Sequence, residues 1–292
     1  MTVGIAALCS GGTSIVVGND MRASFGPLRP NEYAGKQWDF DVSFPVVACV
    51  AGKFGLCQPI IDELNNRLRR TLPRKRPVYC EHIENAINYA RFRIFYRLVD
   101  WEMKMGYCVT LKQFQAERIG GKKITRMMHQ ELVRFVKNHD LKAELVVGGF
   151  LANGNILFYK ASRKNPIEAS TSPGVYVIGT GGTLAMAHLN RRGQNLHDGL
   201  LSTLLHISEA LDEAQKVSDG TVGHPQALTI LHRDGRIERL PAKSQALADW
   251  KRAYKNRDIT ASLDESSAAW DQMKYQLVRH RPKRSVAQRS ED

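Results

Sequence analysis

The sequence has few cysteines, only five in 292 residues, and they are scattered along the chain with no Cys-x-x-Cys pair. An odd, dispersed set predicts neither a disulfide framework nor a zinc site, so we expect a reducing, cytoplasmic setting. Long apolar runs are also missing. The longest have the length of strands, so no membrane-spanning helix is predicted. The start of the chain lacks a basic segment followed by a long apolar stretch, so no secretory signal is expected.

Acidic residues are scarce relative to basic ones, with 29 Asp and Glu against 42 Lys and Arg, and the formal net charge is +13. The densest basic stretch is RLRRTLPRKRP at residues 67–77. Binding to nucleic acid or another acidic surface is one interpretation of this charge. No aromatic residues are interleaved with it and no known nucleic-acid motif accompanies it, so a solvated helix end and loop is the favoured interpretation.

What is present is enough apolar sequence, 43% of the residues, for a substantial core. β-branched runs separated by turn residues predict strands in hairpins, and therefore largely antiparallel sheets. Two sheets face to face, with helices on each outer face, would bury every apolar face. The expected strand segments are 2–10, 14–20, 36–52, 143–150, 155–162, 174–182 and 226–240, and the expected helices are 54–70, 80–106, 122–139, 183–192 and 196–216.

The composition changes near residue 243. We expect one α+β domain over residues 1–242, enlarged by a long helical region between about residues 72 and 140. Residues 243–292 form a polar C-terminal extension with two short amphipathic stretches that contain Trp250 and Trp270. Its basic end has few apolar residues and is expected to be flexible.

The segment MTVGI carries the first chemical signal, because Thr2 follows the initiator methionine at the start of a strand. Methionine is trimmed ahead of small residues, so a trimmed chain would begin with Thr2. That residue would offer a hydroxyl nucleophile and a free α-amine with an unperturbed pKa of about 8, which can act as its base. Asp20 ends the second predicted strand, Lys36 begins the third, and the GTGG turn at 179–182 joins a strand to a helix.

Taken together and in this order, these motifs resemble the proteasome β-subunit family of N-terminal-nucleophile (Ntn) hydrolases, including the bacterial HslV-type peptidases. The resemblance spans about residues 2–240. Thr180 replaces a serine of the family's GSGG motif, and Val222 falls where many members have serine. The matching segments are NDMRAS, the AGK before the third strand, VAGKFG, ELVVGGF, IGTGG and DGTVG.

The resemblance implies a role for each site residue. Asp20 would hold Lys36 by a charge-assisted hydrogen bond, and the Lys36 ammonium would favour a neutral amine on Thr2. A backbone amide at Gly52 would stabilise the tetrahedral oxyanion. The remaining implied residues are Thr180 and Asp219, which would orient the amine and a water, and Ala23, Ser24 and Phe54, which would shape the substrate pocket.

The resemblance also implies a four-layer αββα Ntn-hydrolase sandwich and a threonine-type endopeptidase that assembles as a homo-oligomeric ring. Peptides or unfolded proteins would be its substrates, with an AAA+ unfoldase or other regulator as a partner. No cofactor and no metal are expected, because His188, His197, His206 and His224 lack metal-binding spacing with carboxylates. Two alternatives remain open. The chain could be a non-catalytic ring subunit, as retained Met1 would indicate, or an amidase acting on a small metabolite.

Overall fold

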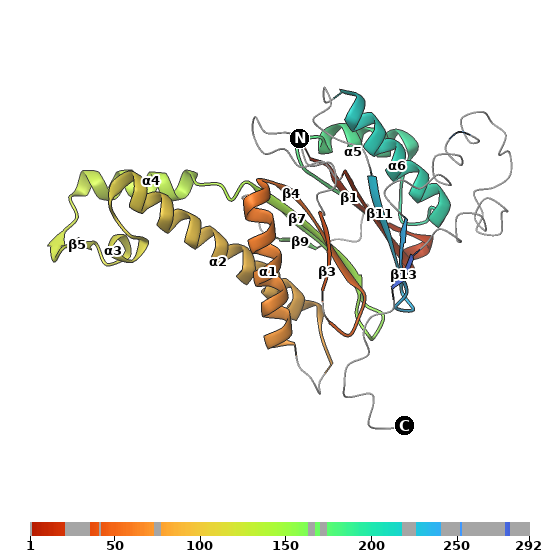
Figure 1. Ribbon diagram of the computed structural model, residues 1–292, viewed down its shortest axis with the longest axis horizontal. Coiled ribbons are helices and arrows are strands. Elements are labelled where there is room, and N and C mark those ends of the chain that lie inside the picture. Colours follow the sequence, from red (N-terminus) through yellow and green to blue (C-terminus); the bar gives the residue numbers. More distant parts are fainter. Residues whose placement is uncertain are drawn as a thin grey trace.

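Two antiparallel sheets and the helices packed on them form the body of the molecule (Figure 1). The computed structural model describes residues 2–20, 36–40, 42–72, 77–162, 167–169, 174–217, 226–240, 252 and 278–280. The expected α+β class with antiparallel sheets is confirmed.

The first sheet has the strand order β10-β1-β2-β11-β12-β13. Its centre is the predicted hairpin of β1 (Gly4–Cys9) and β2 (Ser14–Asp20), joined by a short 3-10 turn at Ser10–Gly12. The register runs from Gly4 opposite Asn19 to Cys9 opposite Ser14, which brings the two free strand ends together. The other strands are β10 (Val175–Ile178), β11 (Gln226–His232), β12 (Ile237–Leu240) and β13 (Val278–His280).

The second sheet has the order β3-β4-β7-β8-β9. β4 (Val46–Gly52) pairs along its whole length with β7 (Ala143–Phe150). Both faces of β4 are buried up to Ala51, which explains its continuous apolar sequence. The other strands are β3 (Gln37–Asp39), β8 (Ile156–Ala161) and β9 (Ile167–Ala169), of which β9 was not predicted.

Three clusters of buried apolar side chains hold these elements together. α1 (Phe54–Thr71) and α2 (Cys80–Tyr107) share a cluster with the second sheet. α5 (Gly182–Arg192) and α6 (Leu200–Val217) share another with the first sheet. The third cluster joins the facing sides of the two sheets. Burial of these apolar surfaces is the main stabilising contribution to the fold.

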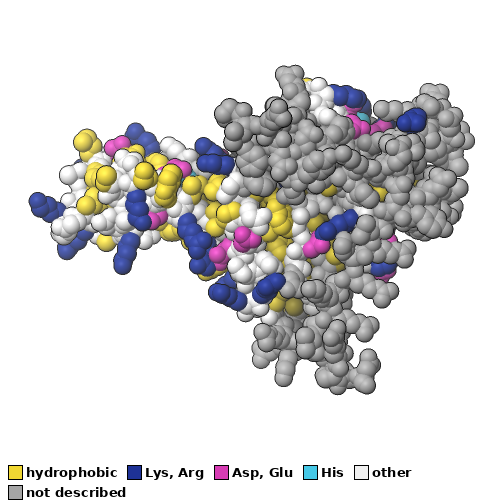
Figure 2. All heavy atoms as spheres, viewed as in Figure 1, with side chains coloured by type: hydrophobic (Ala, Val, Ile, Leu, Met, Phe, Trp, Pro, Cys, Tyr) yellow, Lys and Arg dark blue, Asp and Glu magenta, His cyan; other side chains and the backbone are white. Residues whose placement is uncertain are grey.

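Part of α2 leaves the body and carries an arm, which we define as residues 95–139 (Figure 1). The arm has its own apolar cluster around Val99, Met103 and Leu132. Figure 2 shows apolar and basic side chains together on its visible face. Its other elements are α3 (Leu111–Gln115), β5 (Arg118–Ile119), β6 (Lys122–Lys123) and α4 (Arg126–Asn138).

Two findings complete the description of the elements. Residues 107–121, which separate the second and third predicted helices, contain α3 and β5. The start of the third predicted helix at residue 122 is wrong, because Lys122–Lys123 form β6 and α4 begins at Arg126. α3 begins with a capping box in which Thr110 and Gln113 each satisfy the other's backbone amide. Within the described ranges, every helix is too short or too polar to cross a bilayer.

Candidate active site

The register of the first hairpin brings Asp20 beside the N-terminal end of β1. The Asp20 backbone amide donates to the Val3 carbonyl at 3.2 Å, and Asp20 Oδ1 accepts from the Val3 amide at 2.8 Å. Asp20 is completely buried. The carboxylate therefore fixes the backbone directly after Thr2, as the strand ends of a paired hairpin would predict.

Lys36 reaches the same point from the second sheet. Its Nζ donates to Asp20 Oδ2 at 2.8 Å and lies 3.4 Å from Thr2 Oγ1. The Lys36 and Asp20 side chains are only 4% and 1% exposed, so this is a buried ion pair. Removing two charges from water is costly, and the loss of either partner would leave the other charge buried without compensation. The ion pair directs an ammonium group at the Thr2 hydroxyl.

The turn that follows β10 holds the backbone of Thr2. The Thr2 nitrogen donates to Thr180 Oγ1 at 3.3 Å, and the Gly181 amide donates to the Thr2 carbonyl at 3.4 Å. Gly179 has a φ of +90°, and a Cβ there would lie 2.0 Å from the Thr2 carbonyl oxygen. Only glycine allows so close an approach. The first glycine of the GTGG sequence is therefore required by its contact with Thr2.

Gly52 ends β4 immediately before α1. Its φ is +122°, and a Cβ would lie 2.2 Å from the Lys142 carbonyl oxygen, so this position also requires glycine. The neighbouring Lys53 amide donates to the same carbonyl at 2.9 Å. The conformation explains the glycine of the VAGKFG motif, while its role as an oxyanion donor stays a prediction.

The remaining predicted site residues are placed less completely. Phe54 is the first residue of α1, two positions after Gly52. Ala23, Ser24 and Asp219 lie outside the described residues. One residue near the site was missed from the sequence: Glu144 on β7, whose carboxylate accepts from the Gly179 amide. Its one signal was an acidic residue within an otherwise apolar strand, AELVVGGF.

Two cysteines, Cys49 and Cys57, lie close enough to the ion pair to feel the charge of Lys36. Burial raises the pKa of the Cys49 thiol to about 12, although the Lys36 charge opposes the shift. Burial likewise raises the pKa of the Cys57 thiol to about 11. Both thiols are therefore protonated at neutral pH, and the thiolate is the reactive form. These two thiols are therefore poor candidates for a nucleophile, and the role of the Thr2 hydroxyl stays a prediction.

A thiol-alkylation experiment checks this conclusion. With iodoacetamide at about pH 8, we expect Cys108, which is exposed, to be alkylated while Cys49 and Cys57 stay unmodified in the folded protein. Peptide mass spectrometry locates the adducts, and the unfolded chain serves as the control in which all five cysteines react. Labelling of native Cys49 at the rate of Cys108 would contradict the buried, protonated state.

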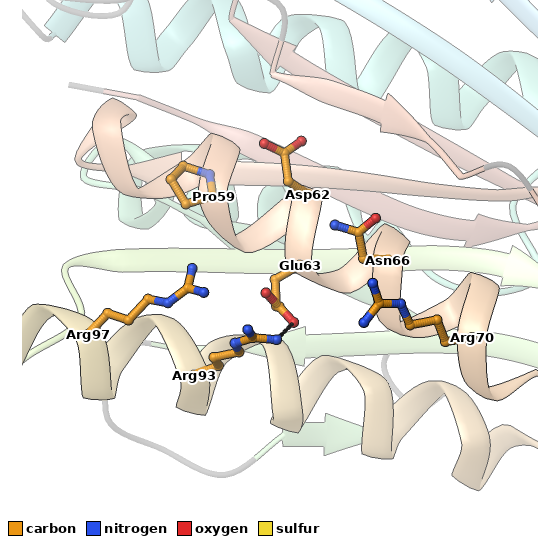
Figure 3. Close-up of a pocket in the computed structure, with 7 residues that line it drawn as sticks. All are labelled: Pro59, Asp62, Glu63, Asn66, Arg70, Arg93 and Arg97. Atoms are coloured by element: carbon orange, nitrogen blue, oxygen red, sulfur yellow. Dashed lines mark hydrogen bonds and ion pairs between the residues drawn. The ribbon is translucent and has the colours of Figure 1, made fainter.

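A separate cleft of about 400 Å³ lies between α1 and α2 (Figure 3). Arg93 Nη1 donates to Glu63 Oε1 at 2.7 Å within it. No predicted site residue lines the cleft, and none of its side chains is a hydroxyl or thiol nucleophile. Among the described residues, no group of three or more His, Cys, Asp or Glu side chains could hold a metal ion. The cleft is lined by Pro59, Asp62, Glu63, Asn66, Arg70, Arg93 and Arg97.

Comparison with known proteins gives matches in structure but not in sequence. No family model and no curated protein matches the chain. A Gly-1 mutant of Anbu from Hyphomicrobium sp. strain MC1 is 14% identical with a TM-score of 0.61, over 89% of this chain and 97% of that one. A protein described as a helical assembly of the Anbu complex from Pseudomonas aeruginosa is 18% identical with a TM-score of 0.59, over 92% and 100%. Anbu (ancestral β-subunit) from Yersinia bercovieri is 12% identical with a TM-score of 0.60, over 89% and 95%.

These matches correct the family assignment made from the motifs. The assignment to the proteasome β-subunit family with its HslV-type peptidases is wrong, because the structural neighbours are Anbu proteins and no sequence match supports HslV. Identities of 12–18% are evidence for the fold alone. The chain is thus similar in fold to the Anbu (ancestral β-subunit) proteins.

Proposed function

We propose that this protein is a threonine-type endopeptidase whose nucleophile is Thr2, exposed by removal of Met1. The observation that carries the proposal is the buried Asp20–Lys36 ion pair, with Lys36 Nζ 3.4 Å from Thr2 Oγ1. This ion pair is buried, and its ammonium group lies beside a hydroxyl at the start of the chain. In that position it can activate the hydroxyl. A purely structural subunit has no need of it.

The proposed reaction has two steps. The free α-amine of Thr2 takes the hydroxyl proton, directly or through a water, and Oγ1 forms a bond to the substrate carbonyl carbon. The tetrahedral intermediate collapses when the amine returns the proton to the leaving nitrogen, which breaks the peptide bond and leaves an ester on Thr2. Water then attacks the ester carbon and gives up a proton to the same amine. The bond from that carbon to Oγ1 breaks, the amine returns the proton to Oγ1, and the carboxylic acid product leaves.

The surrounding groups have distinct tasks in this proposal. The Lys36 ammonium stabilises the developing alkoxide, and Asp20 holds Lys36 in place. A backbone amide at Gly52 stabilises the oxyanion, a contribution of roughly 3 kcal/mol in comparable sites. Thr180 orients the Thr2 nitrogen, with which it shares a hydrogen bond. Asp219 would assist it, and Ala23, Ser24 and Phe54 would shape the substrate pocket.

The proposal extends to architecture and assembly. The packing of α1 and α2 on one sheet and of α5 and α6 on the other supports a four-layer αββα sandwich over residues 1–242, with residues 243–292 as an extension.

The helical assembly described for the Pseudomonas aeruginosa Anbu complex supports a homo-oligomer, as a closed ring or an open helix. The arm would contact a second ring or an AAA+ unfoldase. The protein would work in the cytoplasm without a cofactor.

Digestion of a chemically unfolded, fluorophore-labelled protein tests the substrate class. We expect new peptide termini, identified by mass spectrometry, with the wild-type protein and none with Thr2→Ala. Hydrolysis of small amides such as glutamine, without cleavage of the unfolded chain, would instead support the amidase alternative. The absence of both activities in a chain that begins with Thr2 would support the scaffold alternative.

A further inference from the structure

We propose that Glu144 is a positioning residue of the Thr2 site, whose carboxylate ties the turn after β10 to the end of β4. This inference rests on the proposed function for its effect on catalysis. Glu144 comes from the second sheet, whereas the turn and Thr2 belong to the first. One side chain therefore sets the spacing between two parts of the site that are built on different sheets.

The position of Glu144 follows from the strand pairing. Glu144 lies opposite Ala51, and Ala143 lies opposite Gly52, so Glu144 is at the end of β7 nearest the proposed oxyanion glycine. Leu145 and Val147 pack toward the helices, while Val146 belongs to the cluster between the sheets. Because side chains alternate along a strand, Glu144 shares the inner face with Val146.

The contact itself is short and involves a charged acceptor. Glu144 Oε2 accepts a hydrogen bond from the Gly179 amide at 2.5 Å. A bond from a backbone amide to a carboxylate is stronger than one to a neutral oxygen. It joins the second sheet to the first near the site, as the Lys36–Asp20 ion pair also does. Two charged side chains thus reach the surroundings of Thr2, Glu144 at the Gly179 amide and Lys36 at the Asp20 carboxylate.

The geometry beyond Gly179 leaves little freedom for the turn to move. Gly179 lies against the Thr2 carbonyl. Thr180 Oγ1 accepts a hydrogen bond from the Thr2 nitrogen at 3.3 Å, a distance near the long limit for such a bond. A small displacement of the turn would break that bond and release the Thr2 nitrogen. A misplacement of 1 Å can reduce catalysis by about 100-fold.

Two substitutions and a matched control test the proposal. Glu144→Gln keeps an oxygen acceptor but removes the charge, and Glu144→Ala removes the acceptor. Glu168→Ala is the control, because Glu168 is an exposed glutamate on β9 of the same sheet. We expect Glu144→Ala to lower kcat for peptide cleavage by roughly 10- to 100-fold with KM changed less than about twofold. The kcat of Glu144→Gln should lie between those of Glu144→Ala and the wild type, and the kcat of Glu168→Ala should equal that of the wild type.

A second measurement separates this proposal from the proposed function. Hydrogen exchange of the peptide covering residues 175–182 should speed up in Glu144→Ala, while the peptides of α6 exchange as in the wild type. That local change in a protein without peptidase activity would support the contact and reject the proposed function. Unchanged exchange at residues 175–182, an unchanged kcat, or a loss of protection spread equally over the whole first sheet would overturn the positioning role.

Discussion

Replacing Thr2 with alanine is expected to lower peptide hydrolysis by at least ~10⁴-fold, because the substitution removes the hydroxyl oxygen that we propose attacks the substrate. Thr2→Ser should retain measurable activity, since serine keeps both the hydroxyl and the adjacent α-amine. Alanine and serine are both small, so removal of Met1 should proceed equally in the two variants. The measurement is kcat/KM on a fluorogenic peptide, together with the intact mass of each variant.

The comparison with Thr2→Ser separates the loss of the nucleophile from a loss of folded protein. Thr2 is only partly buried, so neither substitution leaves a large cavity, and both variants should unfold at about the temperature of the wild type. If Thr2→Ala kept its activity while Met1 was removed, the nucleophile would have to be another group. The protonated Cys49 and Cys57 would then need to be examined first.

The buried ion pair gives the second large effect, and here stability and activity should separate. Lys36→Met leaves the Asp20 carboxylate buried without its cation, which is expected to reduce the free energy of unfolding by about 3–5 kcal/mol. The double variant Asp20→Asn/Lys36→Met removes both charges. Its amide oxygen can still accept from the Val3 amide, so most of the lost stability should return. Denaturant unfolding midpoints measure this difference.

Peptide hydrolysis should not return in the double variant. Without the ammonium 3.4 Å from Thr2 Oγ1, the developing alkoxide loses its nearest stabilising charge. A stable double variant without activity would mean that the ion pair serves chemistry more than folding. A double variant as active as the wild type would remove Lys36 from the mechanism.

The larger elements could be predicted from the sequence because each carries its own pattern. The first hairpin follows from two apolar β-branched runs around GGT, and α1 and α2 follow from their helical periodicity. β5 and β6 have two residues each and β9 has three, which is too short for any period to appear. β13 is a strand because it pairs with β12, which lies far from it in the sequence. The local sequence of β13 does not indicate that pairing.

The candidate site shows the same limit. Asp20 could be placed beside the start of β1 from the hairpin alone, because the pairing of two adjacent strands fixes it. The contact of Lys36 with Thr2 depends on packing between the two sheets, and the contact of Thr180 with Thr2 depends on the pairing of β1 with β10, two strands far apart in the sequence. Both contacts were expected only through a family resemblance. Glu144 was missed because its partner is a backbone amide on the other sheet. The structure agrees with the short motifs in its α+β class and its antiparallel sheets, but the motifs did not distinguish HslV-type peptidases from Anbu proteins.

The most direct test of the account is the intact mass of the purified, untagged protein before and after reaction with a peptide electrophile that requires both a hydroxyl and an adjacent free amine. The account predicts a chain that begins with Thr2 and gains one adduct, mapped to Thr2 by fragmentation. A chain that keeps Met1 and gains no adduct would contradict it, because the α-amine would then be blocked and Thr2 could not act as an N-terminal nucleophile.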